Sequence, residues 1–133
     1  MANGVNAYKK TSLATASKEK ILLLLYQAAI KNCRLAIDAM EEKNIAKKGE
    51  HIGKLQDIIL ELNSCLDHSV GGQLSQELSS LYDYMLYSST QANIKIDPVP
   101  LKSCLSILNT LYDGWVEAVN KLSRDQKDKL NHE

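Results

Sequence analysis

Apolar residues recur at spacings of three and four over most of the chain, which is the period of one face of an α-helix. The first such stretch follows Ser17, a residue type that caps helices, and runs to about Glu42. The second follows Asn44, another capping residue, and runs to about Asp67. No stretch alternates apolar and polar residues convincingly with the period of two that is typical of a strand. The pattern therefore predicts an all-α fold.

Turn residues separate two further helical stretches. The pair Gly71–Gly72 lowers helix stability and lets the backbone reverse, so it forms the clearest break in the chain. The dipeptide Asp97–Pro98 is typical of a helix start, because proline at the first helical position loses no hydrogen bond. Four amphipathic helices with short connections bury their apolar faces most simply as an antiparallel, up-down-up-down four-helix bundle.

One domain is expected, because 133 residues with 44% hydrophobic content suffice for a single core. Residues 1–16 are small, polar and aperiodic, which predicts a flexible N-terminal arm. Ser123 and Gln126 resemble a capping box, which predicts a polar C-terminal tail or short helix over 123–133. The predicted bundle spans 17–122, with helices at about 17–42, 45–67, 73–92 and 98–122.

The first helix carries two apolar stripes. One contains Ile21, Leu25, Ala28, Leu35, Ala36 and Ala39 and is interrupted by Asn32; the other contains Leu23, Tyr26, Ile30, Cys33, Ile37 and Met40. Their centres lie roughly 120° apart in projection. A helix at the corner of a bundle buries one such arc, so the second predicts a cover: the arm, a second copy or a partner. The alternative is a central helix with neighbours on both sides.

The other helices also carry apolar or small residues beside their core stripes. These are Ile58 and Cys65 in the second helix, Tyr84 and Tyr87 in the third, and Ile107, Gly114 and Ala118 in the fourth. Leaving a large apolar side chain exposed forgoes roughly 1.5–3 kcal/mol relative to burying it. The surplus therefore favours a protein that binds another polypeptide.

Charge and cysteine content narrow the function classes. Sixteen basic residues balance sixteen acidic ones, so there is no net positive electrostatic field to attract nucleic acid or an anionic membrane surface. The longest apolar run is too short for membrane insertion. Cys33, Cys65 and Cys104 are odd in number and widely spaced, which fits free thiols in the cytoplasm.

No catalytic, metal or cofactor motif stands out. The spacing of His51, His68 and His132 to acidic residues matches neither a di-iron nor a zinc pattern, and no glycine-rich phosphate loop is present. We therefore expect neither an enzyme nor a cofactor. One rival class remains, a histidine phosphotransfer bundle with His51 as the acceptor, although Gly53 precedes Lys54 where that class has the reverse order.

Several strings resemble the FliS family of flagellin-specific export chaperones. Tyr8 and the Thr15–Ser17 string precede the first helix, and Leu24–Tyr26 with Ala29 and Ile30 partly match a family segment. The strings Leu81–Met85 and Asp113–Trp115 match family strings in full. Lys18 stands where the family usually has proline, and Gln27 and Ala28 replace its Asp-Gly.

The resemblance implies a cytoplasmic chaperone that binds the disordered C-terminal segment of flagellin, blocks its premature polymerisation and delivers it to the export gate protein FlhA. An amphipathic flagellin segment would suit the apolar surplus, because helices dock in apolar grooves with little charge. We expect the arm to lie over apolar surface in the free protein and to shift when flagellin binds. A self-associating bundle, such as a homodimer, is the second function class.

The expected contact residues come from the arm and from all four helices. They are Tyr8, Leu13, Leu23, Tyr26, Ile30, Ile58, Tyr84, Ile107 and Gly114. Leu81, Tyr82, Met85 and Trp115 are assigned to the core, with hydrogen-bond partners expected for the Tyr82 hydroxyl and the indole N–H of Trp115.

Overall fold

A computed structural model describes residues 17–131 of the chain. The predicted arm, with Tyr8 and Leu13, lies outside the described residues, as do residues 132 and 133. The described part forms four helices: α2 (Lys18–Glu41), α3 (Ile45–Ser64), α4 (His68–Lys95) and α5 (Val99–Asn131). It contains no strand, and the predicted all-α fold is confirmed.

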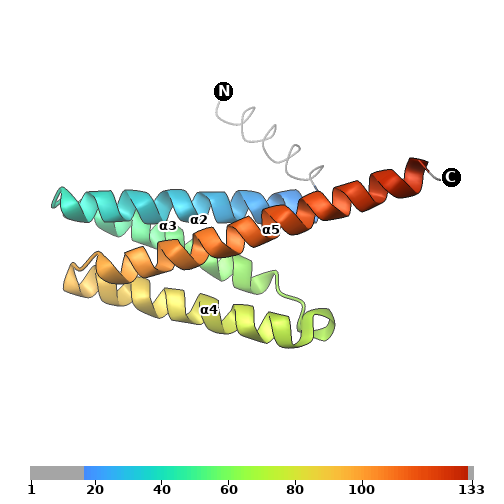
Figure 1. The fold of residues 1–133 in the computed structure, drawn as a ribbon. Coiled ribbons are helices and arrows are strands. Elements are labelled where there is room, and N and C mark those ends of the chain that lie inside the picture. Colours follow the sequence, from blue (N-terminus) through green and yellow to red (C-terminus); the bar gives the residue numbers. More distant parts are fainter. Residues whose placement is uncertain (1–16, 132–133) are drawn as a thin grey trace, which may run out of the picture.

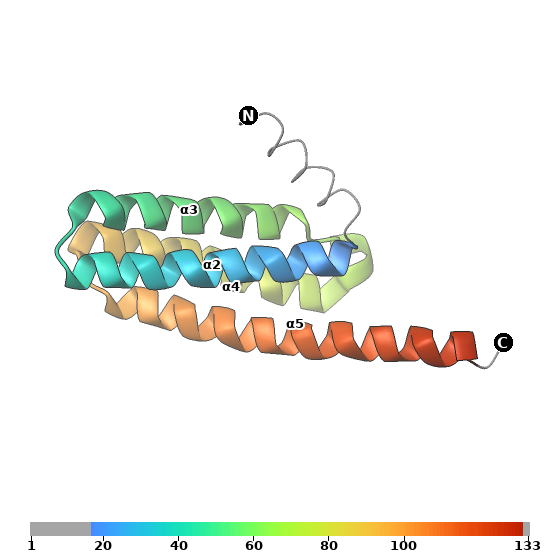
Figure 2. The same cartoon turned by 90° about the horizontal axis from the view of Figure 1, so that it is seen from above.

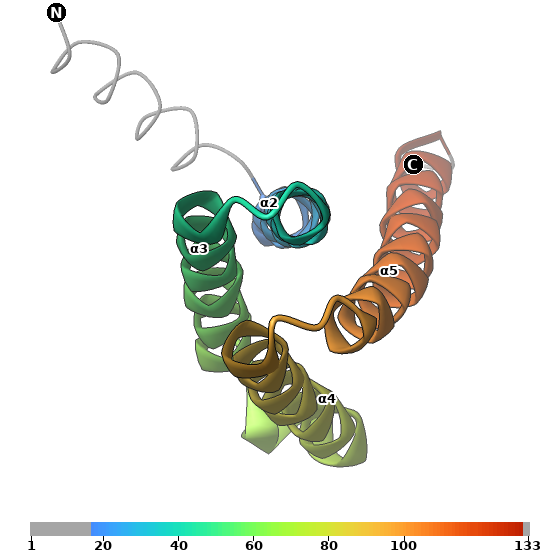
Figure 3. The same ribbon diagram turned by 90° about the vertical axis from the view of Figure 1, so that its left-hand side faces the viewer.

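The helices pack as an antiparallel bundle in chain order. α2 contacts α3 and α5, and α4 contacts the same two helices, so each helix has two principal neighbours (Figures 1 and 2). Figure 3, seen along the bundle, shows the turn from α2 to α3 and the connection from α4 to α5 at the same end. The connection from α3 to α4 lies at the other end, beside the start of α2 (Figure 2).

Side chains cap the starts of all four helices. Each accepts a hydrogen bond from a backbone N–H of the first helical turn, at 3.0–3.2 Å; the capping residues are Ser17, Asn44, Asp67 and Asp97. These N–H groups have no partner within their helix, so the caps decide where each helix begins.

The start of α4 differs from the predicted boundary. His68–Gly71 form one helical turn, and the main body of the helix begins after Gly72, whose φ of 53° and ψ of −124° are non-helical. This conformation favours glycine because glycine lacks a Cβ atom. Gly71 lies against the Ser75 hydroxyl, where a Cβ atom would clash. α3 correspondingly ends at Ser64, three residues before the predicted end.

α5 corrects the expected break near residue 123. It continues as one helix from Val99 to Asn131, so no separate tail or short helix begins at Ser123 within the described residues. Residues 120–130 are exposed and project beyond the other helices (Figures 1 and 2). Neither glycine nor proline interrupts this stretch, so the helix already begun at Val99 can propagate through it.

The core shows which stripe of α2 faces inward. In the stripe with Tyr26, all members but the half-buried Leu23 are buried, namely Tyr26, Ile30, Cys33, Ile37 and Met40. In the other stripe only the small residues Ala36 and Ala39 are buried, whereas Ile21, Leu25, Ala28 and Leu35 are half-buried. α2 has α3 on one side and α5 on the other, but every helix of the bundle has two such neighbours, so α2 is not more central than the others. The core is completed by Ile52, Leu55, Ile59, Leu62, Leu78, Met85, Leu101 and Leu108.

A candidate partner-binding surface

A pair of buried tyrosines joins α2 to α4. The hydroxyl oxygens of Tyr26 and Tyr82 lie 2.6 Å apart, and both side chains are at most 1% exposed. Burial raises the pKa of both phenols, because a buried phenolate loses its hydration. Each hydroxyl is thereby satisfied inside the core, which confirms the partner expected for Tyr82.

An apolar groove opens above this pair at the end of the bundle where α3 turns into α4. It consists of two adjoining pockets of about 510 and 280 Å³ that share Leu22 and Cys65. We call it the loop-end groove and define it by Leu22, Leu25, Cys65, Leu66, Val70, Leu74 and Trp115. Tyr82 lies at its floor. The groove is therefore continuous with the core while open to solvent.

The groove wall exposes large aliphatic side chains. Leu74 is 54% exposed and Val70 is 84% exposed, although both belong to a helix with a buried side. The charged lining residues are Lys18, Glu19 and Asp67. The Asp67 carboxylate accepts hydrogen bonds from the backbone and hydroxyl of Ser69, which lower its pKa, so this charge is committed to the turn. What remains for a partner is mainly apolar surface.

Trp115 corrects one expectation about the core edge. Its side chain packs against the core, and its buried indole nitrogen makes no hydrogen bond of good geometry within residues 17–131. The indole N–H nevertheless lies close enough to the Tyr26 hydroxyl to oppose part of the rise that burial causes in the pKa of that phenol. The expected bond at the edge of the core is therefore not formed there.

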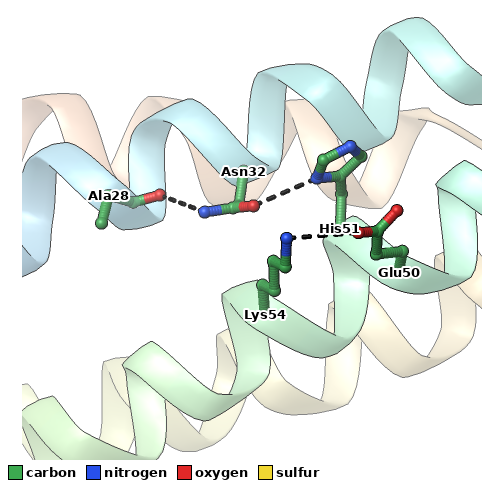
Figure 4. A network of polar contacts seen from close by, with 5 residues as sticks. All are labelled: Ala28, Asn32, Glu50, His51 and Lys54. Atoms are coloured by element: carbon green, nitrogen blue, oxygen red, sulfur yellow. Dashed lines mark hydrogen bonds and ion pairs between the residues drawn. The ribbon is translucent and has the colours of Figure 1, made fainter. Parts of the chain in front are cut away.

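His51 lies in a polar bridge between α2 and α3. Its Nδ1 atom is 3.1 Å from the side-chain oxygen of Asn32, whose amide nitrogen donates to the carbonyl of Ala28 at 2.9 Å (Figure 4). That oxygen can only accept, so Nδ1 of His51 carries the proton and donates. His51 is half-buried rather than a solvated surface residue, and its bond to α2 argues against a free phosphate acceptor.

Neither metal chemistry nor a membrane span is apparent in the part that the structure describes. No group of three or more histidine, cysteine, aspartate or glutamate side chains there could hold a metal ion. Of the helices described, none combines the length and apolar character needed to cross a bilayer.

Comparison with known proteins decides the family. The family model described as "Flagellar protein FliS" matches residues 1–122. The chain belongs to the FliS family. It is 40% identical to the flagellar secretion chaperone FliS of Vibrio cholerae, over 86% of this chain and 88% of that one. It is 34% identical to the FliS of Bacillus subtilis, over 93% and 92% of the two chains.

A solved structure shares the fold. A crystal structure of a bacterial flagellar chaperone superposes with a TM-score of 0.74 at 19% identity, covering 90% of this chain and 98% of that chain. The strings that resemble FliS also meet in space, because Tyr26 contacts Tyr82 while Tyr82 and Trp115 both line the loop-end groove. The residues typical of FliS therefore build the floor of this groove.

The expected contact residues of this FliS chain fall into four groups. Tyr26 and Ile30 lie in the core, at 0% and 7% exposure, so their side chains offer almost no surface to a partner. Leu23, Ile58 and Ile107 are half-buried, whereas Tyr84 and Gly114 are exposed. The remaining two, Tyr8 and Leu13, lie outside the described residues.

Most of the groove residues were not expected from the sequence. Leu22, Leu66, Val70 and Leu74 come from two helices and the connection between α3 and α4, so no single helical stripe contains them. One signal was available: Val70 and Leu74 flank the Gly71–Gly72 pair, where large aliphatic residues have little reason to stand on a solvated turn.

Proposed function

We propose that this FliS chain is a cytoplasmic flagellar secretion chaperone that binds the C-terminal segment of flagellin in the loop-end groove. Binding there would prevent premature polymerisation and keep the segment available for the export apparatus. The supporting observation is the groove itself, an apolar surface on an otherwise closed bundle with Leu74 and Val70 exposed. This role requires binding without a chemical step, as in the chaperones to which the chain is related.

Physical considerations favour an amphipathic segment as the guest. Each large aliphatic side chain removed from water contributes roughly 1.5–3 kcal/mol. Folding a disordered segment on the bundle would bury on the order of 1,000–3,000 Å² and cost a few kcal/mol in ordering. The sparse charge of the groove lining favours apolar anchors at helical spacing over an acidic or basic peptide.

Residues 1–16 are the proposed internal competitor for the groove. The described chain begins at Ser17, and Lys18 and Glu19 already line the groove. Leu13 is four residues before Ser17, a reach of at most about 14 Å, so it can be placed over the groove. Tyr8 would be the second anchor. Flagellin would displace this arm.

Limited proteolysis tests whether residues 1–16 compete with flagellin for the groove. The arm should be cut slowly in the free protein and faster once a flagellin C-terminal peptide saturates the groove. An arm cut equally fast in both states would contradict this part of the proposal. In this proposal the export gate protein FlhA then binds the chaperone with its displaced arm and receives the flagellin. The alternative is that a second copy of the chain covers the groove in a homodimer.

Isothermal titration calorimetry with a flagellin C-terminal peptide tests the main proposal. Binding should show a negative heat-capacity change, the signature of apolar burial. Absence of binding, together with a mass that rises with protein concentration, would instead indicate a self-associating bundle. A peptide that binds without a heat-capacity change would contradict the apolar groove as its site.

A further inference from the structure

The end of the bundle opposite the loop-end groove contains two backbone conformations that side chains with a Cβ atom rarely adopt. Lys43 follows α2 and Ile96 follows α4, and their φ angles of 59° and 52° lie in the left-handed region. In each turn the next backbone N–H bonds back to a carbonyl of the preceding helix, at 2.8 and 3.1 Å. Glycine is the usual residue at this position, and a β-branched residue such as isoleucine is strained there. Ile96 therefore lowers the stability of its own turn, and strained residues cluster at functional sites.

The two turns border an apolar hollow of about 410 Å³. Its lining includes Ala39, Met40, Lys43, Ile45, Lys48 and Ile96. Ile45 is 56% exposed and Ile96 is 53% exposed, although both line the hollow, and Val99 at the start of α5 is 64% exposed. Figure 3 looks onto this end, where both connections face the viewer. We call Ile45, Ile96 and Val99 the turn-end patch, because three large aliphatic side chains protrude here from the end of the bundle.

Lysines surround the turn-end patch. Lys43, Lys47 and Lys95 are exposed, and none of them forms an ion pair within residues 17–131. Lys48 is buried, and its ammonium donates to the backbone carbonyl of Asn93 at 3.1 Å, which ties the start of α3 to the end of α4. Residues 41–48 and 94–102 together contain five lysines and three acidic residues, whereas the whole chain is neutral. This end of the bundle is therefore locally positive.

Two of the three acidic residues at this end are already engaged. The Glu41 carboxylate pairs with the Lys102 ammonium at 3.7 Å. The Asp97 carboxylate accepts a hydrogen bond from the backbone N–H of Val99 at 3.0 Å. Glu42 is the third and is exposed. Around the patch, three lysines thus stand against one glutamate.

We propose that the turn-end patch inserts into the surface of an anionic lipid bilayer and binds the chaperone reversibly to the membrane at this end. Aliphatic side chains enter the boundary between headgroups and acyl chains, while the flanking lysine ammonium groups stay among the anionic headgroups. The bundle lies on the bilayer without crossing it. The proposal goes beyond the function proposed above and does not depend on what the groove binds.

The size of the patch favours lipid over a protein partner. A stable and specific protein interface buries about 800 Å² on each partner, which three protruding side chains at the end of a bundle do not provide. A bilayer needs no matching shape, because its binding strength depends on the inserted apolar area and on the attraction between basic residues and anionic lipids. Both are present at the turn end.

The groove and the patch are far enough apart to act at the same time. Leu22 lines the loop-end groove and Met40 lines the hollow, and the rise of α2 between these two residues is about 27 Å. Figure 2 shows the start and the end of α2 at opposite ends of the bundle. A chaperone bound to a bilayer by the patch therefore keeps its groove open to solvent.

A matched pair of serine substitutions on α3 tests the proposal. Ile45→Ser removes a member of the patch, whereas Leu60→Ser is the control, because Leu60 is 53% exposed and lies toward the other end of the same helix. The full chain is centrifuged with vesicles of phosphatidylglycerol and phosphatidylcholine in equal parts, and with vesicles of phosphatidylcholine alone. The wild type should float only with the first. Ile45→Ser should weaken this binding about tenfold, and Leu60→Ser should leave it unchanged.

Ile96→Gly separates binding from folding. Glycine adopts the left-handed region without strain, so this variant should unfold at a higher temperature than the wild type. It should nevertheless bind the anionic vesicles less well, because a protruding aliphatic side chain is lost. A variant that is more stable than the wild type cannot lose binding by unfolding. Higher salt should weaken binding of the wild type, since it screens the lysines.

The possible results divide clearly. A wild type that did not float with the anionic vesicles, or floated equally with both kinds, would overturn the proposal. Equal binding by Ile45→Ser and Leu60→Ser would overturn the patch as the site. If Ile45→Ser instead abolished a concentration-dependent mass of the free protein, the patch would bind a second copy and the lipid assignment would be wrong. No flagellin peptide enters these measurements, so their failure leaves the proposed function untouched.

Discussion

Tyr82 and Tyr84 stand two residues apart on α4, yet they belong to different surfaces. Tyr82 is 1% exposed, pairs with Tyr26 and has its pKa raised by burial. Tyr84 is 48% exposed, and the neighbouring Ser103 hydroxyl lowers the pKa of its phenol. One side of α4 therefore closes the bundle, and the other carries apolar surface that the bundle does not need.

The contrast separates stability from binding on a single helix. Residues on the inner side should govern the free energy of unfolding and affect a guest only through the fold. Residues in the loop-end groove should govern guest affinity and leave folding nearly unchanged. The following variants and conditions test whether stability and guest binding depend on different residues.

Tyr82→Ala is expected to have the largest effect. It removes a buried ring and leaves the Tyr26 hydroxyl without its partner, which should lower the free energy of unfolding by about 3–5 kcal/mol. Tyr84→Ala is the control on the outer side and should leave stability nearly unchanged. Urea unfolding followed by circular dichroism measures both. Similar losses for the two variants would contradict the division of α4.

Alkaline pH should destabilise the core through two buried thiols, one on α2 and one on α5. Burial raises the pKa of Cys33 to about 12 and that of Cys104 to about 11, from an ordinary 9.0. Their contribution to stability is complete below the pKa of the unfolded thiols, near 9, and is lost as pH rises toward 11–12. Unfolding at pH 10 should therefore be easier than at pH 7.5 by about 2 kcal/mol. Cys104→Ala should reduce this dependence, and an unchanged pH profile would contradict it.

A charge in the groove should act on binding alone. Leu74→Lys places an ammonium on a wall residue that is 54% exposed, so folding can tolerate it. Affinity for a flagellin C-terminal peptide should fall about tenfold or more, which corresponds to about 1.4 kcal/mol. Ser80→Lys, six residues further along the same helix, is exposed and outside the groove lining, so it is the control and should leave affinity nearly unchanged. If Leu74→Lys did not change affinity either, the guest would bind elsewhere.

The smallest effect is expected when both inner hydroxyls are removed together. Tyr26→Phe alone leaves the Tyr82 hydroxyl buried and unpaired, at a cost of about 1–3 kcal/mol. The double variant with Tyr82→Phe removes donor and acceptor together and should recover most of that loss. A double-mutant cycle in urea measures the coupling. Additive losses would show that the two hydroxyls do not depend on each other.

The sequence predicted the helices better than their contacts. Ser17, Asn44 and Asp97 marked the starts of α2, α3 and α5 because capping is a local interaction. The break at residue 123 was wrong because a capping-box pattern also occurs within a continuing helix. The local capping pattern therefore predicted where the helices begin more reliably than where they end.

The site depended on packing that the sequence does not contain. Projection found two stripes on α2 but could not tell that the one with Tyr26 and Ile30 faces the core. Tyr84, Ile107 and Gly114 were expected to contact a partner because each stands beside a core stripe on its own helix. The loop-end groove joins Leu22 to Leu74 across the bundle, and only the fold brings these residues together.

Cys65 provides the most direct test of the central claim, that the apolar surface left open by the closed bundle is where the guest binds. It is exposed and shared by both pockets of the groove, whereas Cys33 and Cys104 are buried. Alkylation of the unmodified chain should therefore report on Cys65 alone. A saturating flagellin C-terminal peptide should slow this reaction in proportion to the bound fraction. A peptide that binds by calorimetry while Cys65 reacts at its original rate would contradict the account.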